Sequence, residues 1–210
     1  LYLQSFSGGF IKTKNTPWER HKFTEDIDAL FLDVDNDNDM DLYVVSGGNE
    51  FESNNPAYLD RLYLNDGLGD FIFSKKSLPS LFLSGSVVTA SDYDQDGDLD
   101  LFIGSKLKPW NYPEPTSSYI LKNNKGVFKI DSVNSKNFKD WGMVSDAVWT
   151  DIDNDNDKDL VVVGEWSSIR VYENMAGILY PKPSPNLDQL KGWWFTIKEA
   201  DIDNDGDMDL

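Results

Sequence analysis

One acidic motif occurs four times in the chain and constrains its fold more than any other feature. Each copy spans ten residues, places Asp at positions 1, 3, 5, 7 and 9, and ends with Leu. The copies occupy residues 33–42, 92–101, 151–160 and 201–210, so they begin 59, 59 and 50 residues apart. Repeats of this length are typical of propellers and stacked-repeat proteins. The chain is therefore predicted to fold as a series of similar units.

The charge of the chain is concentrated in these motifs. They contain 20 of its 37 acidic residues, and the formal net charge of the 210 residues is -18. Carboxylates a few ångströms apart repel each other by roughly 1 to 4 kcal/mol per pair near a protein surface, so a bound cation is expected. The negative charge disfavours nucleic acids and anionic membranes as partners. With no Cys and one His, disulfides, thiolate zinc sites, Cys nucleophiles and several-His sites are excluded from this stretch.

The spacing of the carboxylates favours calcium, a hard cation that takes about six to eight oxygen ligands. Positions 1, 3, 5 and 9 are expected to coordinate through carboxylates, and position 7 through its backbone carbonyl, with its carboxylate facing solvent or binding through water. Position 6 must turn sharply and is Asn38, Gly97, Asn156 or Gly206, the residue types that best tolerate positive φ. We predict about four calcium ions, one per loop. Magnesium and simple solvated acidic turns are the alternatives.

The predicted metal residues are all the Asp side chains of the four motifs. They are Asp33, Asp35, Asp37, Asp39, Asp41, Asp92, Asp94, Asp96, Asp98, Asp100, Asp151, Asp153, Asp155, Asp157, Asp159, Asp201, Asp203, Asp205, Asp207 and Asp209. An EF-hand is excluded because position 12 is Val44, Ile103 or Val162 rather than Glu, and the following residues are typical of β-strands.

Short apolar runs surround each motif and predict a four-stranded antiparallel meander in every unit. The first strands are expected at 29–32, 87–91, 147–150 and 195–200, and the second strands at 42–45, 101–103 and 160–163. Third strands are expected at 61–64, 118–121 and 169–172, and fourth strands begin at Phe71, Val127 and Ile178. Residues 1–4 and 8–12 resemble 62–65 and 69–73, so the chain is expected to open with strands three and four of a preceding unit.

These units predict an all-β fold, a partial β-propeller whose calcium loops join strands one and two. The expected organisation within the single domain 1–210 is half a blade at 1–17, blades at 24–75, 85–131 and 143–181, and half a blade at 193–210. The two halves either belong to a larger propeller, which is the favoured interpretation, or pair to close a four-bladed ring. No apolar run is long enough for a membrane span, so no membrane insertion is expected.

The motifs resemble the FG-GAP or VCBS repeats of integrin-α-like propellers, whose signature is Asp-x-Asp-x-Asp-Gly-x-x-Asp-Leu. Stretches 86–90, 142–147, 163–166 and 192–194 are similar to bacterial VCBS-repeat proteins that often carry an ASPIC/UnbV domain, although no such domain is present here. The resemblance implies an exported or surface protein with a calcium-stabilised propeller used for binding, and it implies that positions 1, 3, 5 and 9 are ligands. Asn38 and Asn156 depart from the Gly of the signature.

A ligand face is predicted at the end of the propeller opposite the calcium loops, where the long connections lie. Its candidate residues are Glu50, Lys108, Trp110, Tyr112, Glu165 and Trp166. Their aromatic rings suit a glycan or a protein ligand. The alternative is that Trp110 and Trp166 fill gaps between blades. Trp193 and Trp194 are expected to pack along the propeller axis, and His21 is expected to be exposed.

The function predicted from these features is a non-catalytic, calcium-dependent binding or adhesion module. Its expected location is extracellular, at the cell surface or periplasmic, because calcium modules with dissociation constants of about 10⁻⁴ to 10⁻³ M stay empty at cytosolic calcium levels. The alternative is a calcium-dependent polysaccharide lyase or hydrolase in which Lys108 or Tyr112 acts as the base.

Overall fold

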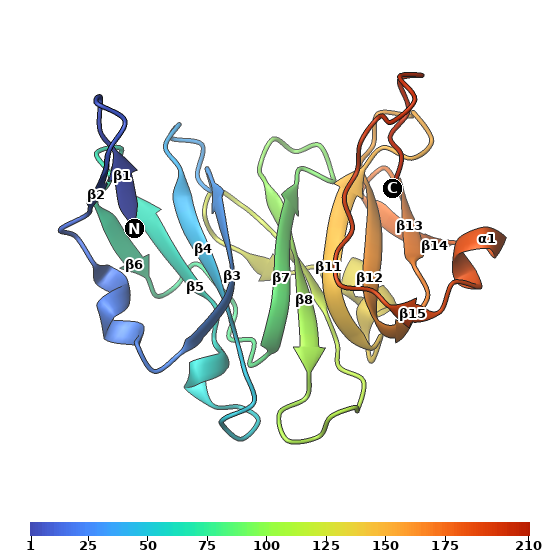
Figure 1. Ribbon diagram of the computed structural model, residues 1–210, viewed down its shortest axis with the longest axis horizontal. Helices are drawn as coiled ribbons and strands as arrows, with labels where there is room; N and C mark the ends of the chain where they lie inside the picture. The colour runs from blue at the N-terminus through green and yellow to red at the C-terminus, as the bar shows by residue number, and fades with distance from the viewer.

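A computed structural model describes residues 1–210 and consists mainly of three four-stranded antiparallel sheets that lie side by side (Figure 1). Blade 1 is formed by β3 (Glu25–Leu32), β4 (Asp41–Gly47), β5 (Arg61–Asn65) and β6 (Phe71–Ser74). Blade 2 is formed by β7 (Ser84–Ser91), β8 (Asp100–Leu107), β9 (Tyr119–Lys122) and β10 (Lys129–Ile130). Blade 3 is formed by β11 (Met143–Thr150), β12 (Asp159–Ser167), β13 (Arg170–Met175) and β14 (Ile178–Lys182).

Within each blade the strands follow one another in chain order, and each pairs antiparallel with the next. The chain is therefore an all-β protein with the architecture of a partial propeller, as the sequence predicts. The first strand of a blade contacts the preceding blade, since β7 contacts β3 and β4 while β11 contacts β7 and β8. The acidic motifs lie at one end of the sheets, the upper end in Figure 1, and the β4–β5 and β8–β9 connections lie at the other.

The second strands form the core because both of their faces are covered. Leu101, Phe102 and Ile103 follow one another along β8 and are all fully buried. Successive side chains of a strand point to opposite faces, so such a run requires neighbouring blades on both sides. Burial of this kind explains why the second strands are continuous apolar runs, and it fixes the position of the motif that precedes each of them.

The remaining elements lie at the ends of the chain, between the blades and in the β4–β5 connection of blade 1. They are β1 (Tyr2–Gln4) paired with β2 (Phe10–Lys12), β15 (Gly192–Trp193) paired with β12, helix α1 (Pro185–Asp188), and 3-10 turns at Pro17–His21, Pro56–Tyr58 and Asn134–Phe138. No helix has the length and apolar character needed to cross a membrane.

Three local predictions were wrong. Val127 lies in a turn closed by its reciprocal backbone hydrogen bonds with Asn124, and strand four of blade 2 begins only at Lys129. The strand predicted at 195–200 is absent, because only Ala200 pairs there, in a single bridge with Asp209. The segment instead runs beside blade 3, where the Ile197 amide donates to Asp146. His21 is half-buried rather than exposed, and its Nδ1 lies 2.8 Å from the Tyr63 hydroxyl.

Candidate metal centres

Each acidic motif forms the connection between strands one and two of a blade, or the corresponding loop at the C-terminal end. The predicted positive φ at position 6 is confirmed, with values of 70° at Asn38, 93° at Gly97, 72° at Asn156 and 96° at Gly206. Position 4 also has positive φ, which the sequence prediction missed. The position 4 values are 64° at Asn36, 57° at Gln95, 60° at Asn154 and 62° at Asn204. Asn is common in this region of conformation, so its recurrence at position 4 was an available signal.

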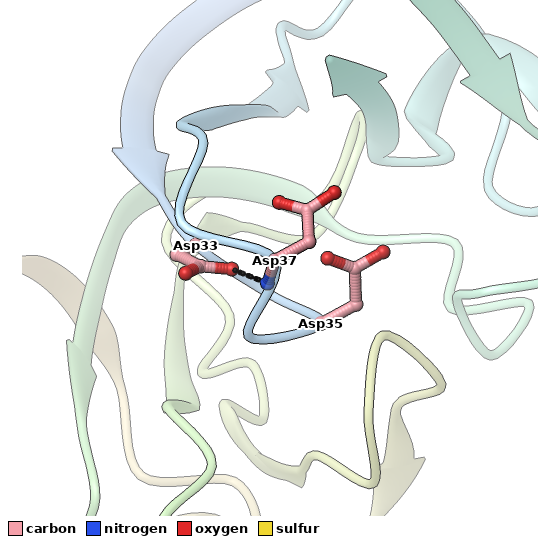
Figure 2. A group of neighbouring side chains, drawn as sticks. All are labelled: Asp33, Asp35 and Asp37. Atoms are coloured by element: carbon pink, nitrogen blue, oxygen red, sulfur yellow. Dashed lines mark hydrogen bonds between the residues drawn. The ribbon is translucent and has the colours of Figure 1, made fainter. Parts of the chain in front are cut away.

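The position 1 carboxylate organises the turn through backbone hydrogen bonds. Asp33 Oδ1 accepts from the Asn36 and Asp37 amides at 2.8 and 3.2 Å, and its Oδ2 accepts from the Asn38 amide at 2.9 Å. Figure 2 shows the Asp33–Asp37 contact beside the Asp35 carboxylate. The other three position 1 residues, Asp92, Asp151 and Asp201, also accept from positions 5 and 6. The conformation of each loop is therefore stabilised by hydrogen bonds from its own backbone amides to the position 1 carboxylate.

Each loop brings three carboxylates close enough to hold one cation, with ligand oxygens all within 4.8 Å of one another. The groups are Asp33, Asp35 and Asp37; Asp92, Asp94 and Asp96; Asp151, Asp153 and Asp159; and Asp201, Asp203 and Asp209. Positions 1 and 3 belong to every group, whereas position 5 belongs to the first two and position 9 to the last two. These donor sets consist only of oxygen, which suits a hard cation.

The position 3 carboxylates carry the clearest sign of a missing partner. Asp35 Oδ1 and Asp94 Oδ1 are shielded from solvent and have no hydrogen-bond partner. Burial, together with the neighbouring Asp37 and Asp33 charges, raises the pKa of Asp35. A buried carboxylate oxygen without a partner is costly, and a cation would satisfy it. The residues present therefore fit a calcium ion.

Position 9 has a second role that the sequence prediction missed. Asp41 Oδ1 accepts from the amide of Asn65 at the end of β5 at 2.8 Å, and its Oδ2 accepts from the Val34 amide at 3.1 Å. Asp100 likewise accepts at 2.7 Å from the backbone amide of Asn123, which directly follows β9, and Asp159 accepts at 2.7 Å from the backbone amide of Asn174 in β13. Burial raises the pKa of Asp41 to about 6 and that of Asp100 to about 7. Position 9 thus clamps strand three to the loop.

Position 7 differs from the prediction that its side chain faces solvent or binds through water. Asp98 is buried, and its Oδ1 accepts a hydrogen bond from Asn36 Nδ2 of the preceding loop at 2.7 Å. Asn154 donates in the same way to Asp207 at 2.6 Å, and Gln95 donates to Asp157. No position 7 carboxylate belongs to a metal group. These side chains link successive loops, because the blade packing places position 4 of one loop against position 7 of the next.

The loops of blades 1 and 2 are also contacted by the following blade, near the end of its third strand. Asn123 donates its side-chain amide to the Val34 carbonyl at 2.8 Å, and Asn174 donates to the Tyr93 carbonyl at 2.7 Å. Gly126, with a φ of +82°, approaches Asp35 so closely that a Cβ there would lie 3.2 Å from the Asp35 Cβ. The metal loops of blades 1 and 2 are therefore held partly by their neighbours.

Two of the loops are contacted by a lysine ammonium from a later strand of the same blade, Lys122 of β9 or Lys182 of β14. Lys122 pairs with Asp94 and lies 3.3 Å from Asp96, while Lys182 lies 3.0 Å from Asp153. The hydrogen bond from Lys182 lowers the pKa of Asp153. The loops beginning at Asp33 and Asp201 have no such ion pair. The four loops therefore differ in their electrostatic environment although their motifs match.

The structure brings three of the six predicted ligand-face residues together at the opposite end of the blades. The Tyr112 hydroxyl contacts Glu165 Oε2 at 3.3 Å, and Trp166 Nε1 contacts the same hydroxyl at 3.4 Å. Trp110 is anchored apart from them, with its indole N–H donating to the Asn49 carbonyl at 2.9 Å.

The other two predicted residues make only local contacts. Glu50 accepts from the Asn49 amide, and Lys108 pairs with Glu114 at 2.8 Å. Trp110 and Trp166 are both exposed, so the alternative that they fill gaps between blades is wrong. Trp193, expected to pack along the axis, is half-exposed as well, because β15 pairs only with the C-terminal end of β12, at Glu165 and Ser167.

A comparison with protein-family models finds a match to the FG-GAP-like repeat over residues 33–103 and 151–210. These two ranges contain all four acidic motifs and cover more than half of the chain. A search of curated proteins found no match.

Proposed function

Because the chain belongs to the FG-GAP-like repeat family, we propose that it is a calcium-stabilised propeller module that binds an extracellular ligand on the face opposite its metal loops. The observation that carries the metal assignment is the pair of buried, unpartnered carboxylate oxygens on Asp35 and Asp94. They occupy the same position in two loops whose position 1 residues are already held by backbone amides. Each of these oxygens still lacks a partner, although Lys122 pairs with the other carboxylate oxygen of Asp94.

Calcium would be held by the carboxylates at positions 1, 3, 5 and 9 and by the position 7 carbonyl. When bound, it supplies charge that cancels the repulsion among the acidic residues. At calcium concentrations ten to a hundred times the dissociation constant, each independent site adds roughly 1.4 to 2.7 kcal/mol to the stability of the folded state. Asn65, Asn123 and Asn174 transmit this stabilisation, since each joins strand three to a metal loop.

The extracellular, cell-surface or periplasmic location follows from the same calcium requirement. FG-GAP-like repeats are typical of extracellular binding modules, and loops of this affinity class fill only where calcium is abundant. The binding role is supported by the exposed aromatic residues on long connections, which a rigid sheet scaffold presents to solvent.

No observation favours the alternative polysaccharide lyase or hydrolase. Lys108, one predicted base, donates a hydrogen bond to Glu114, and this bond raises the pKa of the Lys108 ammonium. A lysine base must be neutral near neutral pH, so this pairing acts against the role.

Thermal unfolding followed by circular dichroism tests the metal assignment. We expect a calcium titration to raise Tm over the value in chelator by several degrees, with millimolar magnesium much less effective. The double variant Asp35→Asn, Asp94→Asn should lose about half of the rise. Asp70→Asn, an exposed acidic control outside the motifs, should keep all of it. If the protein is folded but its Tm does not change when calcium is added, the calcium assignment is wrong.

A further inference from the structure

Four aromatic side chains form a continuous exposed row that extends from the β8–β9 connection of blade 2 to blade 3 and the segment that follows it. Tyr112, Trp166, Trp193 and Phe195 are 50%, 64%, 50% and 73% exposed. Trp166 contacts the Tyr112 hydroxyl, the Trp166 and Trp193 ring centroids are 5.3 Å apart, and those of Trp193 and Phe195 are 6.2 Å apart. The Trp193 and Phe195 rings are nearly parallel, with 16° between their planes. We call these four residues the aromatic row.

The backbone at the centre of the row is in a conformation that Trp rarely adopts. Trp166 has a φ of 58°, and the residue at the same distance from the position 9 Asp in blade 1 is Gly48, with a φ of 101°. The left-handed conformation is strained for a bulky residue because its Cβ approaches the following carbonyl oxygen. Blade 1 avoids this strain with Gly, whereas blade 3 presents a large exposed ring. Strain retained at an exposed aromatic residue is typical of a binding site rather than of packing.

A buried carboxylate, that of Glu165, holds the Tyr112 side chain of the row in place through a hydrogen bond. Glu165, only 6% exposed, pairs through Oε1 with Lys106 Nζ at 2.5 Å and accepts through Oε2 from the Tyr112 hydroxyl. That hydroxyl in turn accepts from Trp166 Nε1. The polar edges of Tyr112 and Trp166 are thus satisfied within the protein, and what they offer to solvent is mainly their ring faces. The Lys106 and Glu165 charges cancel one another.

We propose that the aromatic row binds the apolar ring faces of a neutral glycan, an inference that rests on the proposed binding function and names its ligand class. The C–H faces of sugar rings pack on exposed aromatic rings, and neighbouring rings with centroids 5.3 and 6.2 Å apart form one continuous apolar surface along which a sugar chain can lie. The charged pair that contacts the row, Lys106 with Glu165, is neutral overall, and no cation lies over a ring of the row, which favours a neutral glycan over an acidic one. Of the four residues of the row, only Phe195 lines one of the main cavities of the protein. The central residues of a protein–protein interface usually fit into pockets, so this open surface favours a glycan.

Trp166→Gly is the informative variant, because it removes the ring and relieves the left-handed backbone. It should therefore keep or slightly raise Tm, so that any loss of binding is not a loss of folding. Trp193→Ala removes a second ring of the row. Tyr180→Ala, on β14, removes an exposed aromatic side chain outside the row and serves as the matched control.

Affinity gel electrophoresis in calcium tests the proposal, with β-glucan, xylan or glucomannan in the gel and polygalacturonate as the acidic comparison. At least one neutral polysaccharide should retard the wild-type chain, and Trp166→Gly and Trp193→Ala should weaken this retardation at least tenfold while Tyr180→Ala leaves it unchanged. The glycan proposal would be overturned if only polygalacturonate retarded the wild-type chain, or if Trp166→Gly were retarded as strongly as the wild type. Binding only to a protein partner would also overturn it. If calcium still raises Tm while no neutral glycan binds, the glycan assignment fails and the calcium assignment stands.

Discussion

The side chain of Asn36 reaches across a blade boundary and donates its amide to Asp98, with 2.7 Å between Nδ2 and Oδ1. These residues are position 4 of the first acidic motif and position 7 of the second. Asn154 and Asp207 repeat the relationship between the third motif and the fourth. A motif therefore brings its own carboxylates together and also contacts the next motif, so under the proposed function the occupation of the metal sites is coupled to the packing of the blades.

Replacing Asn36 by Asp should destabilise the joint between blades 1 and 2. The substitution keeps the size of the side chain and its tolerance of positive φ, but it places a carboxylate against Asp98. The free energy of unfolding should fall by about 1 to 3 kcal/mol. Urea unfolding measures the change. Asn54 is an exposed Asn with a φ of 67°, so Asn54→Asp is a matched control that should be nearly neutral, and an equal loss in both variants would contradict the linkage.

Positions 3 and 9 should differ in their dependence on metal. Asp35→Asn removes a carboxylate whose pKa is raised by burial and by its acidic neighbours, so in chelator it should keep or increase stability, and it should lose only the contribution of calcium. Asp41→Asn disrupts the clamp between Val34 and Asn65, so it should lose about 1 to 3 kcal/mol even in chelator. Unfolding of both variants with and without calcium checks this. Identical behaviour of the two would show that position 9 is only a ligand.

Lys122 should act as an internal competitor for calcium in the second loop. Lys122→Gln removes the ammonium that pairs with Asp94, so the apparent calcium affinity of that loop should rise several-fold while stability in chelator falls. Isothermal titration calorimetry and unfolding in chelator measure the two effects. Lys129→Gln changes an exposed lysine without an ion pair and should alter neither. A drop in calcium affinity in Lys122→Gln would argue against competition.

Asp60 should make the calcium-saturated protein less stable as pH rises. Its carboxylate accepts from the Ser46 amide and the Tyr43 hydroxyl, and burial raises its pKa from 3.8 to about 7. The folded state therefore binds the proton more tightly than the unfolded state. The resulting stabilisation is full below pH 3.8 and is lost as pH rises to about 7, with a slope of at most about 1.4 kcal/mol per pH unit.

Asp60→Asn should reduce this pH dependence, because Asn keeps a carbonyl acceptor and cannot titrate. Unfolding at pH 5 and pH 8 in saturating calcium provides the comparison. Asp70→Asn should show the wild-type difference between the two pH values. A wild-type protein that is equally stable at both, or more stable at pH 8, would be inconsistent with a proton held on Asp60.

The properties that the sequence determined by itself are those set by neighbouring residues. The alternation of Asp within ten residues, Asn or Gly at position 6 and the apolar runs on each side predict the hairpins, the loop conformation and the all-β class, because turns and strands depend on local patterning. The carboxylates that approach one another at Asp33, Asp35 and Asp37 also belong to one short segment, so their grouping could be predicted.

Only the tertiary structure decided which loops and aromatic rings meet. Asn36 and Asp98 are 62 residues apart, and the row of Tyr112, Trp166 and Trp193 joins three segments that share no motif. The packing of one blade on the next brings these groups within contact distance, and that packing depends on the burial of whole sheets rather than on any local pattern. The prediction of a solvent-facing side chain was therefore wrong for Asp98, which is buried against the preceding loop, and the predicted axial packing was wrong for Trp193, which is exposed beside Trp166. Asp207 is exposed, as predicted.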